Sequence, residues 1–225
     1  MKIKKLKIHT QNFTAQIDFY TNVLNIPIAY KTETEVCFKI GNTDFILEKH
    51  YQSYPYHFAI TIPANKEKEA LTWLKERVSI LTFEQQEIQD FKNWKAKAMY
   101  FYDKDKNIVE FIARKNLNND SDQPFQSDSL VEISEIGLPV TTIQETYQTL
   151  SETVPLAIYD GNFERFCAIG DENGLFICID KNAKDWFPTN DKAYSAPFEI
   201  DFTESNNQYH LSFTNGQVHI SELKL

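Results

Sequence analysis

The sequence predicts an α+β fold built from repeated βαβββ modules, and three observations support this prediction. Short apolar runs of strand character recur along the chain, the order strand, helix, strand, strand, strand returns, and turn residues separate the runs. The chain has 225 residues, of which 42% are hydrophobic and 24% charged. A chain of this length and composition can bury a core without help from disulfides.

The first module is expected over residues 3–50. Alternation of polar and apolar residues over 5–10 is typical of a half-buried strand. Apolar residues spaced three and four apart predict a helix over 15–24, with Asn12 as its N-cap. Three short strands should follow, at 26–30, 35–40 and 44–48.

The same order of elements recurs in a second module, expected over residues 55–115, and in a third that begins near 133. Their helices are predicted at 68–78 and 143–151. Their strands are predicted at 56–62, 82–84, 98–102, 107–112, 133–140, 156–159, 164–169 and 175–179. The remaining tail has three strand-like runs and no helix pattern, so it looks like a truncated fourth module.

A polar segment without periodicity, Asn116–Ser129, separates the second module from the third. Such a composition is typical of a linker. We therefore predict paired modules in residues 1–115, a linker over 116–129, and the third module with its strand-rich, truncated fourth in 130–225.

Composition and charge exclude several classes of function. The net charge of -9 and the pI near 5.1 disfavour a nucleic-acid partner. No apolar stretch approaches the ~20 residues needed to cross a membrane, and no glycine-rich phosphate motif indicates a nucleotide cofactor. The basic N-terminal run lacks the apolar core of a signal peptide, and three cysteines in apolar runs suggest buried free thiols. We expect a cytoplasmic protein.

Two motifs carry a resemblance to a known family. The run IDFYTNVL at 17–24 and the run YFYDKDKNIVEF at 100–111 are similar to the helix and hairpin signatures of the vicinal oxygen chelate superfamily. That superfamily includes glyoxalase I, extradiol dioxygenases, and fosfomycin- and bleomycin-resistance proteins. The resemblance covers 3–115 well and 131–180 more weakly. It implies a glyoxalase/dioxygenase-like fold, in which pairs of modules form cupped mixed sheets.

The resemblance also implies a divalent metal inside the cup. Imidazole and carboxylate ligands suit Fe²⁺, Mn²⁺, Ni²⁺ or Zn²⁺, and open coordination positions would receive two neighbouring oxygens of a substrate. His57 and Glu110 match two ligand positions of the family pattern, and Glu110 could also serve as the catalytic base. His57 has an alternative interpretation as a satisfied core histidine, and Glu110 as a solvated glutamate.

The other ligand positions depart from the pattern. Lys5 stands where the first module should provide a histidine. His9 and Glu48 are candidates for further metal ligands, because each lies on the same strand face as an expected ligand position and would serve after a shift in register. In the third module Glu135 is the equivalent of Lys5, but no His or Glu in 175–179 completes a set.

These observations predict a metal-dependent enzyme, a lyase, isomerase or ring-cleaving dioxygenase, that acts on a small oxygen-rich or aromatic molecule. The alternative is a metal-free protein of the same fold that binds or sequesters a small molecule, which Lys5 at a usual ligand position favours. The expected partner is a small-molecule ligand, and the chain is expected to be a monomer or a homodimer.

Overall fold

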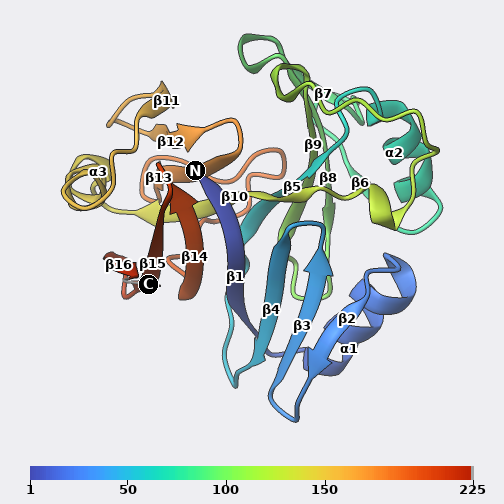
Figure 1. The fold of residues 1–225 in the computed structure, drawn as a ribbon, viewed down its shortest axis with the longest axis horizontal. Coiled ribbons are helices and arrows are strands. Elements are labelled where there is room, and N and C mark those ends of the chain that lie inside the picture. Colours follow the sequence, from blue (N-terminus) through green and yellow to red (C-terminus); the bar gives the residue numbers. More distant parts are fainter. Residues whose placement is uncertain (224–225) are drawn as a thin grey trace.

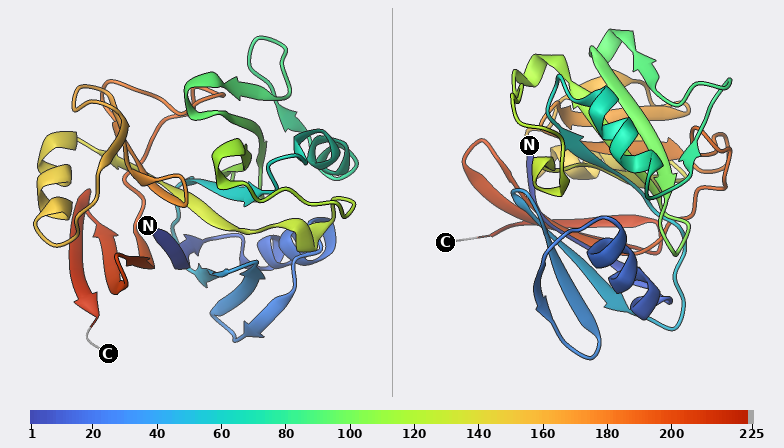
Figure 2. Two further views of the ribbon diagram at one scale, coloured as in Figure 1. Left: turned by 45° about the horizontal axis from the view of Figure 1, so that its top comes forward. Right: turned by 90° about the vertical axis from the view of Figure 1, so that its right-hand side faces the viewer.

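The computed structural model describes residues 1–223, which form two mixed β-sheets and three short α-helices. This confirms the predicted α+β fold of βαβββ modules. The strand order is β16-β15-β14-β1-β4-β3-β2 in the seven-stranded sheet and β11-β12-β13-β10-β5-β9-β8-β6 in the nine-stranded sheet, where β7 also pairs with β8. In Figure 2 (right) the blue and red strands of the first sheet lie below the green and orange strands of the second.

The first two modules supply strands to different sheets (Figure 1). The elements of the first module are β1 (Lys2–Thr10), α1 (Phe13–Asp18), a π-helical turn (Phe19–Val23), β2 (Ile28–Lys31), β3 (Glu35–Ile40) and β4 (Thr43–Lys49). Those of the second are β5 (His57–Ile62), α2 (Glu67–Lys75), β6 (Ile80–Leu81), β7 (Gln89–Phe91), a 3₁₀ turn (Lys92–Trp94), β8 (Ala96–Tyr102) and β9 (Ile108–Arg114).

The third module and the tail complete the two sheets. The elements of the third module are β10 (Glu132–Val140), α3 (Ile143–Ser151), β11 (Ile158–Gly161), β12 (Phe166–Asp171) and β13 (Gly174–Asp180). The tail forms β14 (Phe198–Glu204), β15 (Asn207–Thr214) and β16 (Gln217–Leu223), three consecutive antiparallel strands with no helix between them. Within residues 1–223 the truncated fourth module is therefore a three-stranded meander.

The pairing of the modules differs from the one expected from the sequence. β5 of the second module pairs antiparallel with β10 of the third, and β1 of the first pairs antiparallel with β14 of the tail. The prediction that the first and second modules pair with each other within 1–115 is therefore wrong. The domain boundary over 116–129 stays a prediction.

Burial explains this pairing. Every residue of β5 and of β10 is buried, whereas every second residue along most of β1 is at least partly exposed. A strand whose side chains are all buried fits a sheet that is covered by other residues on both faces. A strand with alternating burial fits a sheet that has one face in solvent. The two fully buried strands therefore lie side by side, and β1 takes a partner whose burial alternates in the same way.

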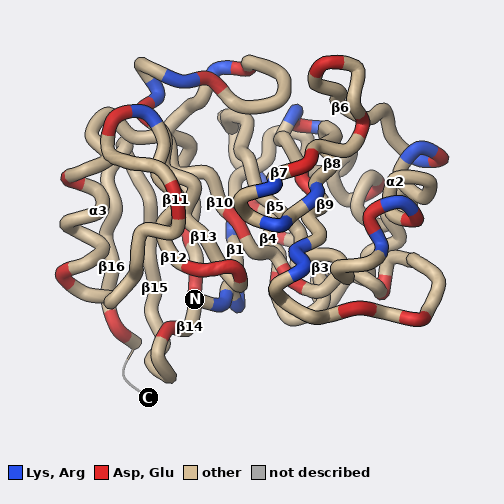
Figure 3. The backbone as a smooth tube through the Cα atoms, turned by 90° about the horizontal axis from the view of Figure 1, so that it is seen from above, with Lys and Arg blue, Asp and Glu red and all other residues tan. Residues whose placement is uncertain are grey.

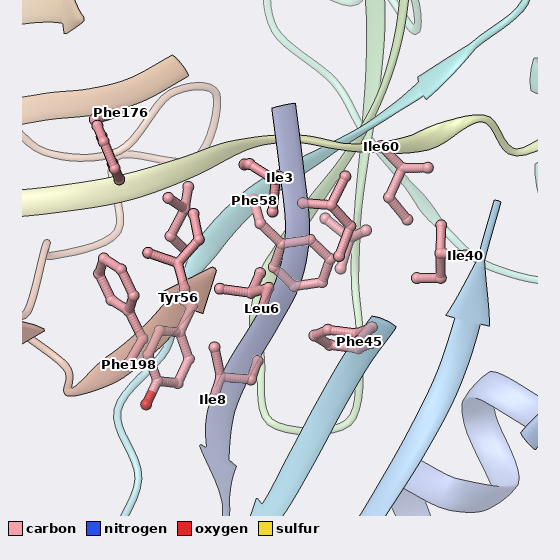
Figure 4. Packing of buried hydrophobic residues seen from close by; sticks show 14 of the residues in the cluster. Ile3, Leu6, Ile8, Ile40, Phe45, Tyr56, Phe58, Ile60, Phe176 and Phe198 are labelled. Atoms are coloured by element: carbon pink, nitrogen blue, oxygen red, sulfur yellow. The ribbon is translucent and has the colours of Figure 1, made fainter. Parts of the chain in front are cut away.

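The main hydrophobic core lies between the two sheets. Its members come from both, and Phe45 of β4 meets Phe58 of β5 with ring centroids 5.1 Å apart. Figure 4 shows Ile3, Leu6 and Phe45 packed against Phe58 across this layer. A second apolar cluster lines the opposite face of the nine-stranded sheet. The main core therefore covers the face of each sheet that points to the other sheet, and the opposite face of the nine-stranded sheet forms the cup.

The hairpin motif between β8 and β9 has a structural role. Asp103 Oδ1 accepts hydrogen bonds from the backbone N–H groups of Asp105 and Asn107, and Asp103 Oδ2 accepts from the hydroxyl of Tyr20 and the amide of Asn107 at 2.8 Å each. The side chain of Asp103 is buried. The two sequence motifs, on α1 and on the hairpin, thus bind to each other.

Replacing Asp103 with Ala should lower the free energy of unfolding by about 3 kcal/mol, because four donor groups lose their acceptor. Urea denaturation checks this value. Asp103→Asn retains one carbonyl oxygen and should cost less than Asp103→Ala. Equal stability of the Asp103→Ala variant and the wild type would contradict a structural role for the motif.

Asn12 stands at the N-cap position of α1, as predicted, but its side chain does not cap the helix. Its side chain forms no capping hydrogen bond within the described residues and instead donates to Asp105 Oδ1 at 2.7 Å. Gln16 also donates to Asp105, and so does the hydroxyl of Thr10. A charged acceptor competes well for the amide of Asn12, because hydrogen bonds to ionised groups are stronger than neutral ones.

The segment 116–129 and the three cysteines can be compared with their predictions. The segment 116–129 packs against α2, since Phe125 is buried with its ring 5.7 Å from that of Trp73. The three cysteines are buried free thiols, as predicted.

No helix among residues 1–223 is long and apolar enough to cross a membrane. Charged residues of both signs are spread over the chain (Figure 3).

Candidate functional site

Three ionisable side chains converge on the nine-stranded sheet. His57 begins β5, Glu110 lies on β9 and Glu135 on β10, and these three strands are neighbours in the sheet. One ligand atom from each lies within 4.8 Å of the others. The three residues are only 6%, 3% and 3% exposed, respectively. Sheet pairing therefore gathers an imidazole and two carboxylates at one buried point.

The hydrogen bonding of His57 leaves one ring nitrogen free for a ligand. Nδ1 lies 3.1 Å from the carbonyl oxygen of Ile108, and because a carbonyl can only accept, Nδ1 must carry the proton. Burial lowers the pKa of His57 to about 4, so the ring is neutral at physiological pH. Nε2 then presents its lone pair to Glu110 Oε2, 3.5 Å away. This is the usual arrangement of a metal-binding histidine, in which the second nitrogen is fixed by a carbonyl.

The two carboxylates differ in their surroundings. Burial raises the pKa of Glu110 well above its usual value, and the nearby charge of Glu135 raises it further. Burial also raises the pKa of Glu135, but the guanidinium of Arg114 opposes this change. Glu110 is therefore the carboxylate that holds a proton more readily.

Arg114, the last residue of β9, supports the site from behind. It is completely buried, and it donates from Nη2 to Glu135 Oε1 and from Nη1 to the hydroxyl of Ser134 at 3.4 Å. Glu110 and Arg114 lie four residues apart on one strand, so both point to the same face of the sheet. Arg114 thus places one fixed positive charge against two negative groups.

The three side chains line a pocket of about 300 Å³. Its walls are mostly aromatic and come from β7, β8, β12, the turn before β8 and the connection between β13 and β14. The aromatic side chains are Phe91, Trp94, Tyr100, Phe166, Trp186 and Phe187. A volume at the lower end of the range for ligand pockets suits a small ring.

Trp186 covers the imidazole, and a glycine makes room for it. The ring centroids of Trp186 and His57 are 5.0 Å apart. A Cβ atom at Gly137 would lie 2.6 Å from the Trp186 ring, so a larger residue at that position would displace the tryptophan. The connection between β13 and β14 therefore closes one side of the pocket.

The structure brings together two of the four predicted metal ligands. His57 and Glu110 face each other, whereas His9 and Glu48 lie on the seven-stranded sheet. Glu48 pairs with Lys7 at 2.7 Å, and the ring of His9 stacks on His50 with centroids 4.5 Å apart. The expectation that His9 or Glu48 joins His57 and Glu110 is wrong, because the first module pairs with the tail and not with the second module.

Lys5 does not reach this pocket either. Its ammonium lies 2.5 Å from Asp201 Oδ2, across the pair formed by β1 and β14. The seven-stranded sheet thus carries an ion pair at the position where the family pattern has a histidine.

The third candidate ligand beside His57 and Glu110 is Glu135, and not His9 or Glu48. In the sequence Glu135 stands at the position equivalent to Lys5, but only the pairing of β5 with β10 brings it beside His57. The fourth ligand position holds Ile177. In the second module His57 pairs with Ile108, and the ligand Glu110 lies two residues further along β9. In the third module Glu135 pairs with Leu175, so the equivalent position on β13 is Ile177.

Sequence reasoning missed other residues of the site entirely. Arg114 continues the alternation of Glu110 and Ile112 along β9, which is a weak signal. Lys184 and Trp186 come from an irregular connection with no repeating pattern, and no sequence signal marks them.

Comparison with known proteins rests on structure, since no protein-family model and no curated protein sequence matches this chain. A proposed dioxygenase from Bacillus subtilis subsp. subtilis strain 168 matches with a TM-score of 0.65 and 10% identity, over 99% of this chain and 84% of its own.

Two further matches cover about half of this chain. A lactoylglutathione lyase from Agrobacterium tumefaciens has a TM-score of 0.42 and 18% identity, over 48% of this chain and 90% of its own. A fosfomycin resistance protein from Listeria monocytogenes, crystallised with Mn(II) and a dihydroxypropylphosphonic acid, has a TM-score of 0.40 and 18% identity, over 51% and 90%. The full-length match to the Bacillus protein shows that the chain adopts a glyoxalase/dioxygenase-like fold, which is the fold that the resemblance of the two motifs implied.

Proposed function

We propose that the protein is an enzyme that holds a divalent transition metal through His57, Glu110 and Glu135 and acts on a small molecule with two neighbouring oxygens. The observation that carries this proposal is the convergence of these three side chains at the bottom of an aromatic pocket. The fold alone does not carry it, since one fold hosts many activities.

The chemistry of the three donors fits such an ion. A neutral imidazole nitrogen and two carboxylates are suitable ligands for Fe²⁺, Mn²⁺, Ni²⁺ or Zn²⁺. Without a cation, burial raises the pKa values of both carboxylates, and the charge of Glu135 raises that of Glu110 further. Arg114 supplies a single compensating charge. A divalent cation would remove the cost of burying two carboxylates side by side.

The side chains of the pocket would divide the work. A bound metal would supply a positive charge that polarises the substrate oxygens. Glu110 would move the proton, as a carboxylate beside a bound metal can do. His57 stays neutral and keeps Nε2 directed at the centre, while Trp186 and Tyr100 exclude water from the ring they hold.

Metal analysis with a matched histidine pair tests the proposal. The protein is stripped with EDTA and titrated with Mn²⁺, and the free ion is measured by electron paramagnetic resonance. We expect one tight site in the wild type, its loss in His57→Ala, and its retention in His9→Ala, whose histidine lies on the other sheet. Equal Mn²⁺ binding by the two variants, or no binding by the wild type, would contradict the proposal.

A metal-free binding protein is the second candidate. Two observations favour it: Arg114 already offsets the charge of Glu135, and Ile177 occupies the fourth ligand position. This candidate predicts that catechol raises the melting temperature of EDTA-treated protein as much as that of Mn²⁺-loaded protein. The enzyme proposal predicts stabilisation by catechol only in the presence of Mn²⁺.

A further inference from the structure

We infer that the substrate of this pocket carries an anionic group and that Lys184 binds it. This inference rests on the proposed function, since it describes the substrate of the same site. Lys184 lies in the connection between β13 and β14, which also supplies Trp186 and Phe187 to the pocket wall. Unlike the three buried groups at the bottom, Lys184 is partly exposed, so it stands nearer to the solvent.

The ammonium of Lys184 lacks a partner in the part of the chain that the structure describes. It forms no ion pair and no side-chain hydrogen bond there, although its Nζ lies 5.9 Å from the centroid of the Phe166 ring. Besides Glu110 and Glu135, the pocket is lined by the carboxylate of Asp160, which already has donors: Oδ2 accepts from the indole of Trp94 at 2.6 Å and Oδ1 from the amide of Gly161 at 2.7 Å.

The charged groups near Lys184 favour an anionic ligand. Arg165 is a second cation near it, and burial together with this neighbour lowers the pKa of Lys184. Among the described residues that line the pocket, Lys184 is the one cation, and Arg165 lies outside the lining. A positive rim attracts and orients anionic ligands.

The two ends of the pocket would orient such a ligand. A metal held by the three buried side chains would take the two neighbouring hydroxyl oxygens, while Lys184 attracts a carboxylate at the other end. A flat ring with two neighbouring hydroxyls at one end and a carboxylate at the other would fit both ends and the aromatic walls between them. The inferred substrate class is therefore an anionic, oxygen-bearing aromatic molecule.

A pair of probes tests this inference. Catechol and 3,4-dihydroxybenzoate share the vicinal hydroxyls and differ in the carboxylate, and their affinities for the Mn²⁺-loaded protein can be measured by quenching of tryptophan fluorescence. We expect the wild type to bind 3,4-dihydroxybenzoate about tenfold more tightly than catechol, as one charge-assisted hydrogen bond would give. Lys184→Gln should lose this preference, and Lys184→Arg should keep it.

Lys192→Gln is the matched control, because Lys192 lies in the same connection but does not line the pocket. It should behave like the wild type. Equal wild-type affinities for the two probes, failure of 3,4-dihydroxybenzoate to bind, or an unchanged preference in Lys184→Gln would overturn the inference. Failure of Mn²⁺ to bind would overturn the proposed function instead, and the same comparison in metal-free protein would still decide the role of Lys184.

Discussion

Replacing Arg114 with Met is expected to lower the free energy of unfolding by about 3–5 kcal/mol, the usual cost of breaking a buried ion pair from one side. Arg114 is completely buried, and its guanidinium is the counter-charge that contacts Glu135. Without it, two carboxylates share a buried place with no cation of the described chain beside them. Urea denaturation of the metal-free protein at pH 7 measures the effect.

A double variant separates the charge from the packing. Arg114→Met with Glu135→Gln removes both members of the ion pair and should be more stable than Arg114→Met alone, because no uncompensated charge of that pair remains. Mn²⁺ should stabilise Arg114→Met more than it stabilises the wild type, since the ion would replace the missing positive charge. A loss of less than about 1 kcal/mol in Arg114→Met would contradict this account.

Replacing Glu110 with Gln is expected to stabilise the metal-free protein at pH 8 and to weaken Mn²⁺ binding on the order of 100-fold or more. The pKa of Glu110 is raised well above its usual value by burial and by Glu135. As the pH rises above 4.5, the unfolded chain releases this proton while the folded chain retains it, so folding loses stability. Gln cannot ionise and escapes that loss, which amounts to about 1.4 kcal/mol for each pH unit that separates the folded-state pKa from the unfolded-state pKa.

The pH profile distinguishes Glu110 from the imidazole beside it. The pKa of His57 is lowered to about 4, so folding also loses stability as the pH falls from 6.5 towards 4. We expect the Glu110→Gln variant to lose less stability than the wild type as the pH rises to 8, and to match the wild type on the acid side. The loss that remains at high pH comes from other carboxyl groups such as Asp103 and Glu135, whose pKa values burial also raises. Urea denaturation at pH 5 and pH 8 measures both.

Glu48→Gln is the control for Glu110→Gln, because Glu48 is a partly exposed carboxylate paired with Lys7. It should bind Mn²⁺ as the wild type does and should not gain stability at pH 8. If Glu110→Gln were no more stable than the wild type at pH 8, Glu110 would not be the strained carboxylate of the site.

Local patterns in the sequence determined the modules. The periodicity over 143–151 reproduces α3, and the apolar runs reproduce strands such as β3 and β13, because these features depend on residues close in the chain. The hairpin motif at 100–111 was also informative, since Asp103 binds the turn beside it and Tyr20 of the other motif. His57 and Glu110 followed from their positions within one module.

Only the tertiary structure decided which modules share a sheet, and with it the rest of the site. The first strand of each module can form backbone hydrogen bonds with several other strands. Because these bonds do not involve side chains, they do not tell which two modules pair. The choice depends on how completely each strand is buried, which involves residues far apart in the chain. For this reason the sequence could name His57 and Glu110, whereas Glu135, Arg114 and Lys184 became visible only when β5 and β10 lay side by side and the connection after β13 closed the pocket.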